Sequence, residues 1–481
     1  MRVKTLPVTA TSRTLLLIVA DGVRYDVLKE ELDAGKLPAM AALVARGALH
    51  AVSSCFPSVT GAAYIPFFVG RFPAAVGVPG LRWYDRSRRI GIWPAHARSY
   101  AGVDIWHLDK DLDRNAHTLF ELAKPSIAAM SMLGRGSKPN IGLSLKWMIR
   151  VAPAHFRGNL KAWRAHEENI TRQFFRRFAR NRPRFASIAL TSPDKLAHKV
   201  GPRSPAVRAS IRDIDTVVKT AESIATRGGW RDLLDIWIVG DHGHDPVENH
   251  EDLHGWLEAQ GLKVRAHPQV FKRHADVALM VGGNAMAHLY LIPKQKFRSY
   301  WSELEPRWQL LHDQLLQRDA IDLLAVALNA HTVRVSNRLR GSAQITQTGI
   351  GRAARWSYKP LTGDPLQLGG ALHDLDMTAA YDASATTAYP DALVQLTAMV
   401  TAKRSGDIVV SASQNWDLRS RFEPVQHVST HGALLRDQMM VPLIVDRPVA
   451  RVPQRTTDVM PSALEVLGLA VPDNLDGRSF L

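Results

Sequence analysis

The chain of 481 residues has a single cysteine, Cys55, and no long apolar run. One thiol excludes an intrachain disulfide and a thiolate metal cluster. The longest apolar runs, residues 15–20 and 439–445, are far shorter than the roughly 18–20 residues that span a bilayer. The first run leads into Asp21 and not into a small-residue cleavage site, so we interpret it as a core strand. On these grounds we expect a cytoplasmic protein without a signal peptide or membrane span.

Acidic residues are also in short supply. The chain has 45 of them against 61 lysines and arginines, a net charge of +16. This excess, spread along the chain, favours anions such as phosphate esters, nucleic acid or acidic lipid. An arginine-rich composition without any binding role explains the charge equally well. No basic block is dense enough to act alone as a nucleic-acid arm, so we infer no obligate nucleic-acid or membrane partner.

The apolar pattern predicts an α/β protein. Strands are expected at residues 15–20, 49–53, 185–190 and 234–239, and helices at 38–47, 162–180 and 205–225. Strand runs this apolar are typical of a mostly parallel sheet covered on both faces. Residues 251–405 mix helices and strands, including a helical segment at 300–330. Strands at 408–410 and 440–445 and a helix at 457–467 follow. We therefore predict a catalytic core (1–250 and 406–481) and an inserted α+β cap (251–405).

Acids and histidines cluster where the predicted core strands end. In open α/β sheets, ligands bind beyond the carboxyl ends of the strands. Each cluster alone has an ordinary explanation, such as a turn or a surface pair, but together they indicate one site. Oxygen and nitrogen ligands without thiolate suit zinc, manganese or magnesium, and three histidines favour zinc. The residues are Asp21, Asp194, His198, Asp241, His242 and His431.

These segments resemble the type I phosphodiesterase/nucleotide pyrophosphatase branch of the alkaline phosphatase superfamily. The resemblance rests on residues 19–24, 56–60, 193–202, 239–243 and 429–432, and on the ending at 455–461 and 473–480. It covers residues 14–85, 185–245 and 407–481. It implies an alkaline phosphatase-like core, with a mostly parallel central sheet flanked by helices, in addition to the inserted cap.

The resemblance also implies roles for the clustered residues. Thr60 would be the nucleophile, because coordination to a cation lowers the pKa of its hydroxyl, and a phospho-threonine would then be hydrolysed. Thr60 is also expected to open a helix whose first amides favour a phosphoryl group. The cofactors would be two divalent metal ions, Zn²⁺ or alternatively Mn²⁺. One would be held by Asp194, His198 and His431, and the other by Asp21, Asp241, His242 and Thr60.

The sequence departs from the family pattern near the nucleophile. Leu81 stands where the family has a phosphate-contacting asparagine, and Arg82 is the candidate replacement as a substrate contact. The residues after Thr60 also lack the usual Pro-Asn-His run. Cys55 partly matches a sulfatase signature, but Val59 replaces its arginine, so we interpret Cys55 as a buried small residue.

Three further histidines, His244, His250 and His254, lie near Asp241 in the sequence. One of them could line the pocket, but we favour surface or cap positions, since a lone histidine is more often a scaffold residue than a ligand.

The sequence thus predicts two-metal-dependent hydrolysis of phosphodiester or pyrophosphate bonds in a small phosphoester, with a nucleotide as one candidate. A phosphomonoesterase or phosphonate hydrolase on the same fold is the first alternative. The second, from a different class, is a catalytically inactive basic protein that binds nucleic acid or membrane. The intact set of six ligands and a threonine argues against the second.

Overall fold

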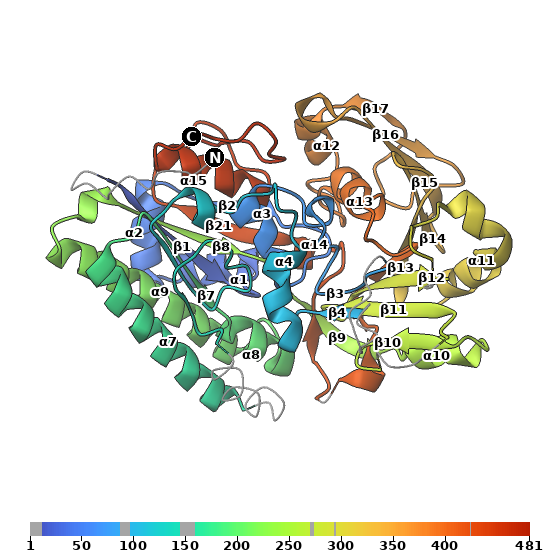
Figure 1. Cartoon of the computed structure of the whole chain (residues 1–481), viewed down its shortest axis with the longest axis horizontal. Helices are drawn as coiled ribbons and strands as arrows, with labels where there is room; N and C mark the ends of the chain where they lie inside the picture. Colours follow the sequence, from blue (N-terminus) through green and yellow to red (C-terminus); the bar gives the residue numbers. More distant parts are fainter. Residues whose placement is uncertain (1–11, 87–96, 145–158, 270–273, 293–294, 424) are drawn as a thin grey trace.

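The computed structural model describes residues 12–86, 97–144, 159–269, 274–292, 295–423 and 425–481. Its first sheet has seven strands, and Figure 1 shows α7 and α9 on one side of it and α3 and α15 on the other. Five strands are parallel, and an antiparallel pair closes one edge. The strand order is β2 (Ala48–Ser53), β21 (Met440–Val445), β8 (Leu234–Gly240), β1 (Thr14–Ala20), β7 (Phe185–Leu190), β5 (Ser126–Ala129) and β6 (Asn140–Ile141).

The register of the central strands positions the site. Every residue of β1 is buried, as the continuous apolar run predicts for a strand covered on both faces. Ala20 at its end pairs with Leu190 of β7 and with Gly240 of β8. The three strands therefore end level, and the residues that follow them meet at one sheet edge. The flanking helices are α1 (Tyr25–Asp33), α2 (Pro38–Arg46), α3 (Tyr64–Val69), α7 (Leu160–Asn181), α8 (Ser192–Val200), α9 (Pro205–Arg227) and α15 (Val459–Val466).

A second sheet of nine strands forms the other half of the molecule (Figure 1). All of its pairings but β10 with β11 are antiparallel. Its order is β10 (Val264–Ala266), β11 (Val277–Gly282), β12 (Met286–Leu291), β18 (Ile408–Ala412), β13 (Ile321–Ala327), β14 (Thr332–Asn337), β15 (Gly341–Thr348), β16 (Arg355–Pro360) and β17 (Leu372–Leu375). Helices α10 (Leu253–Ala259), α11 (Trp301–Leu316), α12 (Met377–Asp382) and α13 (Ala392–Val400) accompany it.

Two small sheets complete the fold. One joins β19 (Asn415–Asp417), β9 (Asp245–His250) and β20 (Ser429–Thr430), and the other pairs β3 (Arg82–Tyr84) with β4 (Ala97–Ser99). The first is important for the site because it brings the segment after residue 415 back to the edge of the central sheet. Within the described ranges, every helix is too short or too polar to cross a bilayer.

The predicted α/β core, with a mostly parallel sheet flanked by helices, is confirmed, but three element predictions were wrong. The helix expected at 300–330 ends at Leu316, and residues 321–327 form the buried strand β13. Strand β18, expected in the core, pairs with β12 and β13 of the second sheet. Thr60 does not open a helix, since α3 begins at Tyr64; the helix predicted to follow Thr60 over residues 64–69 and to stop at Gly70 is itself confirmed. The division into core and cap stays a prediction, with β18 on the second-sheet side.

A buried ion pair connects the two halves. Arg455, just before α15, bonds Asp391, just before α13, with Nε to Oδ2 at 2.7 Å and Nη2 to Oδ1 at 2.6 Å. The two side chains are 4% and 0% exposed, so each charge depends on the other for compensation.

We expect Arg455→Ala to lower the free energy of unfolding by about 3–5 kcal/mol, because it leaves the Asp391 carboxylate buried and unpaired. Urea denaturation measures this loss. The matched control is Arg46→Ala, which removes an Arg46–Glu222 pair that is 41% and 22% exposed and should cost under about 1 kcal/mol. Equal losses in the two variants would contradict the prediction.

Candidate metal centre

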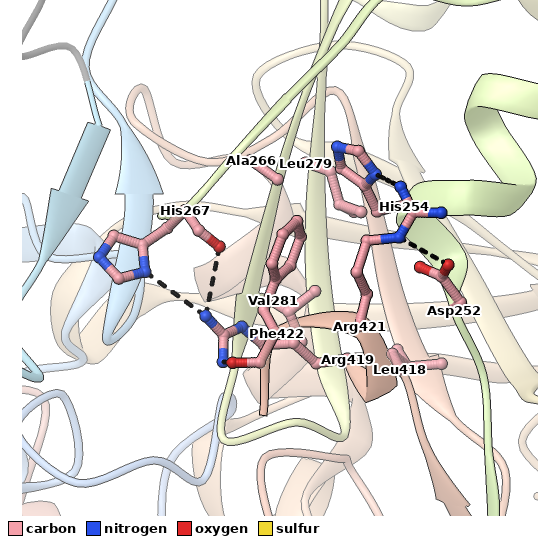
Figure 2. Close-up of a pocket in the computed structure, with 10 residues that line it drawn as sticks. All are labelled: Asp252, His254, Ala266, His267, Leu279, Val281, Leu418, Arg419, Arg421 and Phe422. Atoms are coloured by element: carbon pink, nitrogen blue, oxygen red, sulfur yellow. Dashed lines mark hydrogen bonds and ion pairs between the residues drawn. The ribbon is translucent and has the colours of Figure 1, made fainter. Parts of the chain in front are cut away.

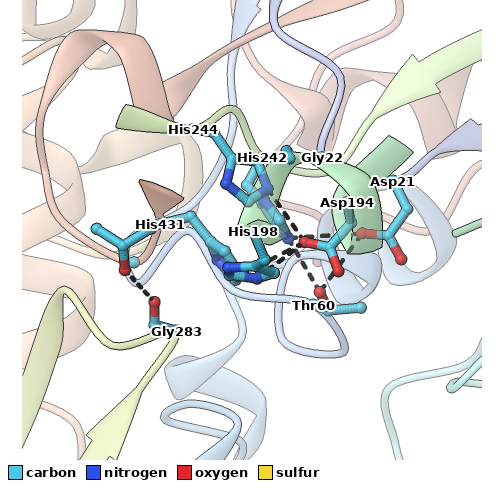
Figure 3. A network of polar contacts seen from close by, with 12 residues as sticks. Asp21, Gly22, Thr60, Asp194, His198, His242, His244, Gly283 and His431 are labelled. Carbon is cyan, nitrogen blue, oxygen red and sulfur yellow. Dashed lines mark hydrogen bonds and ion pairs between the residues drawn. The ribbon is translucent and has the colours of Figure 1, made fainter. Parts of the chain in front are cut away.

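Two groups of potential metal ligands lie beside each other at the carboxyl edge of the first sheet (Figure 3). The ligand atoms within each group lie within 4.8 Å of one another. The rings of His242 and His431, one from each group, stack at 3.6 Å. The Asp21 group consists of Asp21, Asp241 and His242, and the Asp194 group of Asp194, His198, His244 and His431. The structure thus brings together all six ligands that the sequence predicts, while their binding of metal stays a prediction.

Strand ends and one returning segment position these side chains. Asp21 follows β1, and Asp241 and His242 follow β8. Asp194 and His198 lie one turn apart on α8, which begins directly after β7. The remaining ligand, His431, follows β20 of the three-stranded sheet.

Thr60 lies against the Asp21 group. Its Oγ1 is 2.9 Å from His242 Nε2 and 3.5 Å from Asp21 Oδ1. It belongs to a turn that precedes α3, in which Ala63 N donates to Val59 O at 2.9 Å. The predicted contribution of helix amides to phosphate binding therefore has no basis, because the six-residue helix α3 begins four residues after Thr60.

The carboxylates of the Asp21 group are buried and crowded. Gly22 N and His242 N donate to Asp241 Oδ1 at 3.0 and 2.9 Å, but within the described ranges Asp241 Oδ2 has no hydrogen-bond partner. Burial and the nearby charges of Asp241 and Asp194 raise the pKa of Asp21 well above its usual value. An oxygen without a hydrogen-bond donor and like charges in a buried site fit a divalent cation, which would compensate both.

The three predicted histidine ligands share one hydrogen-bonding arrangement. Each ring has its Nδ1 within 2.9–3.1 Å of a backbone carbonyl. A carbonyl only accepts, so Nδ1 carries the hydrogen and the Nε2 lone pair faces the centre. Metal-binding histidines are usually held in this way. The pairs are His198 with Ser429, His242 with Gly243 and His431 with Ser58.

His244 is the site residue that the sequence analysis missed. Its assignment to the surface or cap was wrong: the side chain is fully buried, and Nε2 lies 3.1 Å from Asp194 Oδ1. One signal was available, since His244 follows His242 by two residues in the same loop. His250 and His254 lie outside both groups, with His250 Nδ1 2.7 Å from Asp417 and His254 beside Arg421 (Figure 2).

Among the described residues, Arg82 keeps part of its hydrogen-bonding capacity free for a substrate, whereas Cys55 is enclosed in the core. Arg82 Nη1 donates to Val281 O at 3.1 Å, and Nε is buried without a partner among the described residues. Burial and the neighbouring charge of Arg419 lower the pKa of Arg82 to about 9. Cys55 is buried, and burial raises the pKa of its thiol, so it is an unreactive core residue as expected.

The chain resembles known proteins both in sequence and in structure. The family model described as type I phosphodiesterase / nucleotide pyrophosphatase matches residues 15–434. Human ectonucleotide pyrophosphatase/phosphodiesterase family member 7 is 26% identical over 239 residues, 49% of this chain and 48% of that protein. The match therefore spans about half the length of this curated relative.

Solved structures of another relative share the fold almost from end to end. Murine ectonucleotide pyrophosphatase/phosphodiesterase 5 superposes with a TM-score of 0.58 at 15% identity, over 96% of this chain and 97% of that chain. The human protein gives 0.57 at 14% over the same shares of the two chains. So does an inactive threonine-to-alanine variant of the murine protein in complex with AMP. The alkaline phosphatase-like fold that the sequence predicts is thereby confirmed.

We expect Gly22→Ala to lose bound zinc. Gly22 has a φ of +71°, and an added Cβ would lie 2.8 Å from Asp194 Cα and Cβ and 2.9 Å from His244 Nε2, so the Asp194 group must move. Atomic emission after gel filtration measures the zinc. Gly35→Ala is the matched control, because Gly35 has a φ of +67° with nothing within 4 Å of the added Cβ. It should cost about 1–2 kcal/mol of stability and keep its zinc. A Gly22→Ala protein with wild-type zinc content would contradict the assignment.

Proposed function

The chain belongs to the type I phosphodiesterase / nucleotide pyrophosphatase family, and we propose that it hydrolyses phosphodiester or pyrophosphate bonds through a phospho-threonine on Thr60. One observation carries this proposal: the Thr60 hydroxyl lies 2.9 Å from His242 Nε2, at a centre that contains two groups of mostly buried potential ligands. A partly exposed hydroxyl beside carboxylates and imidazoles, next to a second such group, is the arrangement that phosphoryl transfer to a side chain requires.

We propose that the two groups hold two divalent cations, best zinc and alternatively manganese, because the donors are carboxylate oxygens and imidazole nitrogens without thiolate. The Asp21 group and Thr60 would hold one, and Asp194, His198 and His431 the other. When bound, the cations lower the pKa of the attacking hydroxyl and neutralise charge on the phosphoryl group.

The side chains of this centre orient the nucleophile. His242 donates Nδ1–H to Gly243 O and turns its Nε2 lone pair to the Thr60 hydroxyl. Tyr64 donates to Asp21 Oδ2 at 3.3 Å and so fixes the carboxylate beside Thr60. In the proposed reaction the Thr60 oxygen bonds to phosphorus as the leaving oxygen departs. Water then breaks the bond between phosphorus and the Thr60 oxygen and restores the hydroxyl.

Arg82 is the proposed substrate contact. With leucine at position 81 no amide is available there, whereas Arg82 offers a partly buried guanidinium whose charge has no carboxylate bonded to it among the described residues. Its acceptor, Val281 O, belongs to β11 two residues before Gly283, whose carbonyl accepts from His431 N at 3.3 Å. Arg82 is thus bonded to the strand whose following turn also bonds His431, and we propose that an anionic part of the substrate offsets the desolvation of its guanidinium.

A second arginine lies close to Arg82 and supports an anionic substrate. Arg419, which lines the pocket in Figure 2, bonds His267 O at 3.2 Å and contributes to the lowered pKa of Arg82, although its own charge is paired with Glu423. Burial and these two arginines lower the pKa of His267 to about 3. A nucleotide is the first substrate to test, because a structural relative was solved in complex with AMP.

We expect Thr60→Ala to reduce kcat on bis-p-nitrophenyl phosphate by roughly 10³-fold or more, because the group that bonds to phosphorus is removed. Zinc content should stay near wild type, since the carboxylate and imidazole ligands remain. Thr60→Ser should retain measurable turnover, and Thr216→Ala, on the exposed face of α9, should match wild type. Full activity in Thr60→Ala would overturn the proposal. A panel of diester, pyrophosphate, monoester and phosphonate substrates identifies the preferred class.

We expect Arg82→Ala to raise KM for an anionic nucleotide substrate about tenfold, the equivalent of one charge-assisted hydrogen bond, with zinc content unchanged. Arg82→Lys should recover part of the loss. Arg46→Ala is the surface control for a general effect of net charge. An unchanged KM in Arg82→Ala would show that Arg82 serves only to fix β11.

A further inference from the structure

His198, His242 and His431, to which the proposed function gives a metal, each have Nδ1 at a hydrogen-bond acceptor and Nε2 facing the centre. His244 shares this arrangement, with a serine hydroxyl in place of a backbone carbonyl. Its Nδ1 lies 3.2 Å from Ser429 Oγ, and its Nε2 lies 3.1 Å from Asp194 Oδ1. The ring is fully buried, and Figure 3 shows it directed into the Asp194 group. Its ring centroid is 4.8 Å from that of His198 and 5.0 Å from that of His431.

The hydrogen bonds of Ser429 assign the proton on this ring. Ser429 Oγ lies 2.7 Å from Ala197 O, and because a carbonyl cannot donate, the one hydroxyl hydrogen of Ser429 is used there. Ser429 Oγ therefore accepts from His244, which places the hydrogen on Nδ1. The Nε2 atom of the neutral ring then presents its lone pair to the Asp194 carboxylate.

Two acceptor atoms 3.1 Å apart do not attract each other. An ionised carboxylate has no hydrogen to give, so the contact between His244 Nε2 and Asp194 Oδ1 is favourable only when a cation is shared between them. The lack of a side chain at Gly22 leaves room for the His244 ring, because an added Cβ at that position would lie 2.9 Å from His244 Nε2.

We propose that His244 binds, through Nε2, the same cation as Asp194, His198 and His431, as its fourth protein ligand. This inference rests on the proposed two-cation centre and adds a ligand to it. Three imidazole nitrogens and one carboxylate oxygen are donors that suit zinc, which can take a further oxygen from water or substrate as a fifth ligand. The Asp21 group offers one imidazole and two carboxylates beside the Thr60 hydroxyl. The two sites therefore differ in their ligands.

The decisive experiment counts metal-bound imidazoles in the intact protein. In cobalt(II)-substituted wild type, each histidine bound through Nε2 keeps an exchangeable Nδ1–H, whose proton NMR signal shifts far downfield. We expect four such signals, from His198, His242, His244 and His431, and loss of one in His244→Gln. Three signals in wild type with two cobalt ions bound would overturn this inference and leave the proposed function intact. Absence of bound cobalt would overturn both.

A second measurement uses zinc release. We expect His244→Gln to release one of its two zinc ions to a chromogenic chelator roughly 10–100-fold faster than wild type, with the other ion unaffected. His288→Gln is the matched control, since His288 is another fully buried histidine but bonds Pro79 O and Gly406 N, away from both groups. Its release curve should match wild type. Wild-type release from His244→Gln would overturn the inference, whether or not the variant is active.

Discussion

The crowding of buried carboxylates at one edge of the central sheet is the constraint on which this structure depends. Asp21, Asp194 and Asp241 are at most 3% exposed, and burial together with the charges of Asp241 and Asp194 raises the pKa of Asp21 well above its usual value. Burying like charges is costly unless donors or cations compensate them. Backbone amides of Gly22 and His242 offset part of the cost, and Tyr64 offsets another part. Cations would offset the remaining cost, so metal binding and the stability of this edge would be thermodynamically linked.

The centre also connects the two halves of the molecule. His431 follows β20, which pairs with β9 through Thr430 and Asp245. The same segment is also bonded to the turn between β11 and β12, since Thr430 Oγ1 donates to Gly283 O at 2.8 Å. The segment that carries His431 is thus bonded both to β9 and to the turn of the second sheet, whereas Asp21, Asp194 and Asp241 follow strands of the first sheet. A change in the contact between the halves would therefore move His431 relative to Asp194.

The sequence predicted the parts of the centre that depend on local pattern. Asp21 and Asp241 were found because each follows an uninterrupted apolar run, and such runs end at the ligand edge of a parallel sheet. Residues 321–327 were assigned to a helix because a short apolar run fits either structure, and only pairing with β14 and β18 decides for a strand. His244 was missed for a similar reason. What distinguishes it from a scaffold histidine is the hydroxyl of Ser429, 185 residues away in sequence.

Different parts of the fold determine the reaction and the substrate. Asp21, Asp241 and His242 directly follow β1 and β8, two strands that are buried throughout, so their positions tolerate little change. The groups that would face the rest of a substrate come from elsewhere: Arg82 from the short strand β3 and Arg419 from the segment after β19. These segments are attached to the core by few paired residues, and their side chains can differ without disturbing the ligands. Leucine at position 81 is such a difference, which leaves the two ligand groups complete and changes what the neighbouring surface can bind.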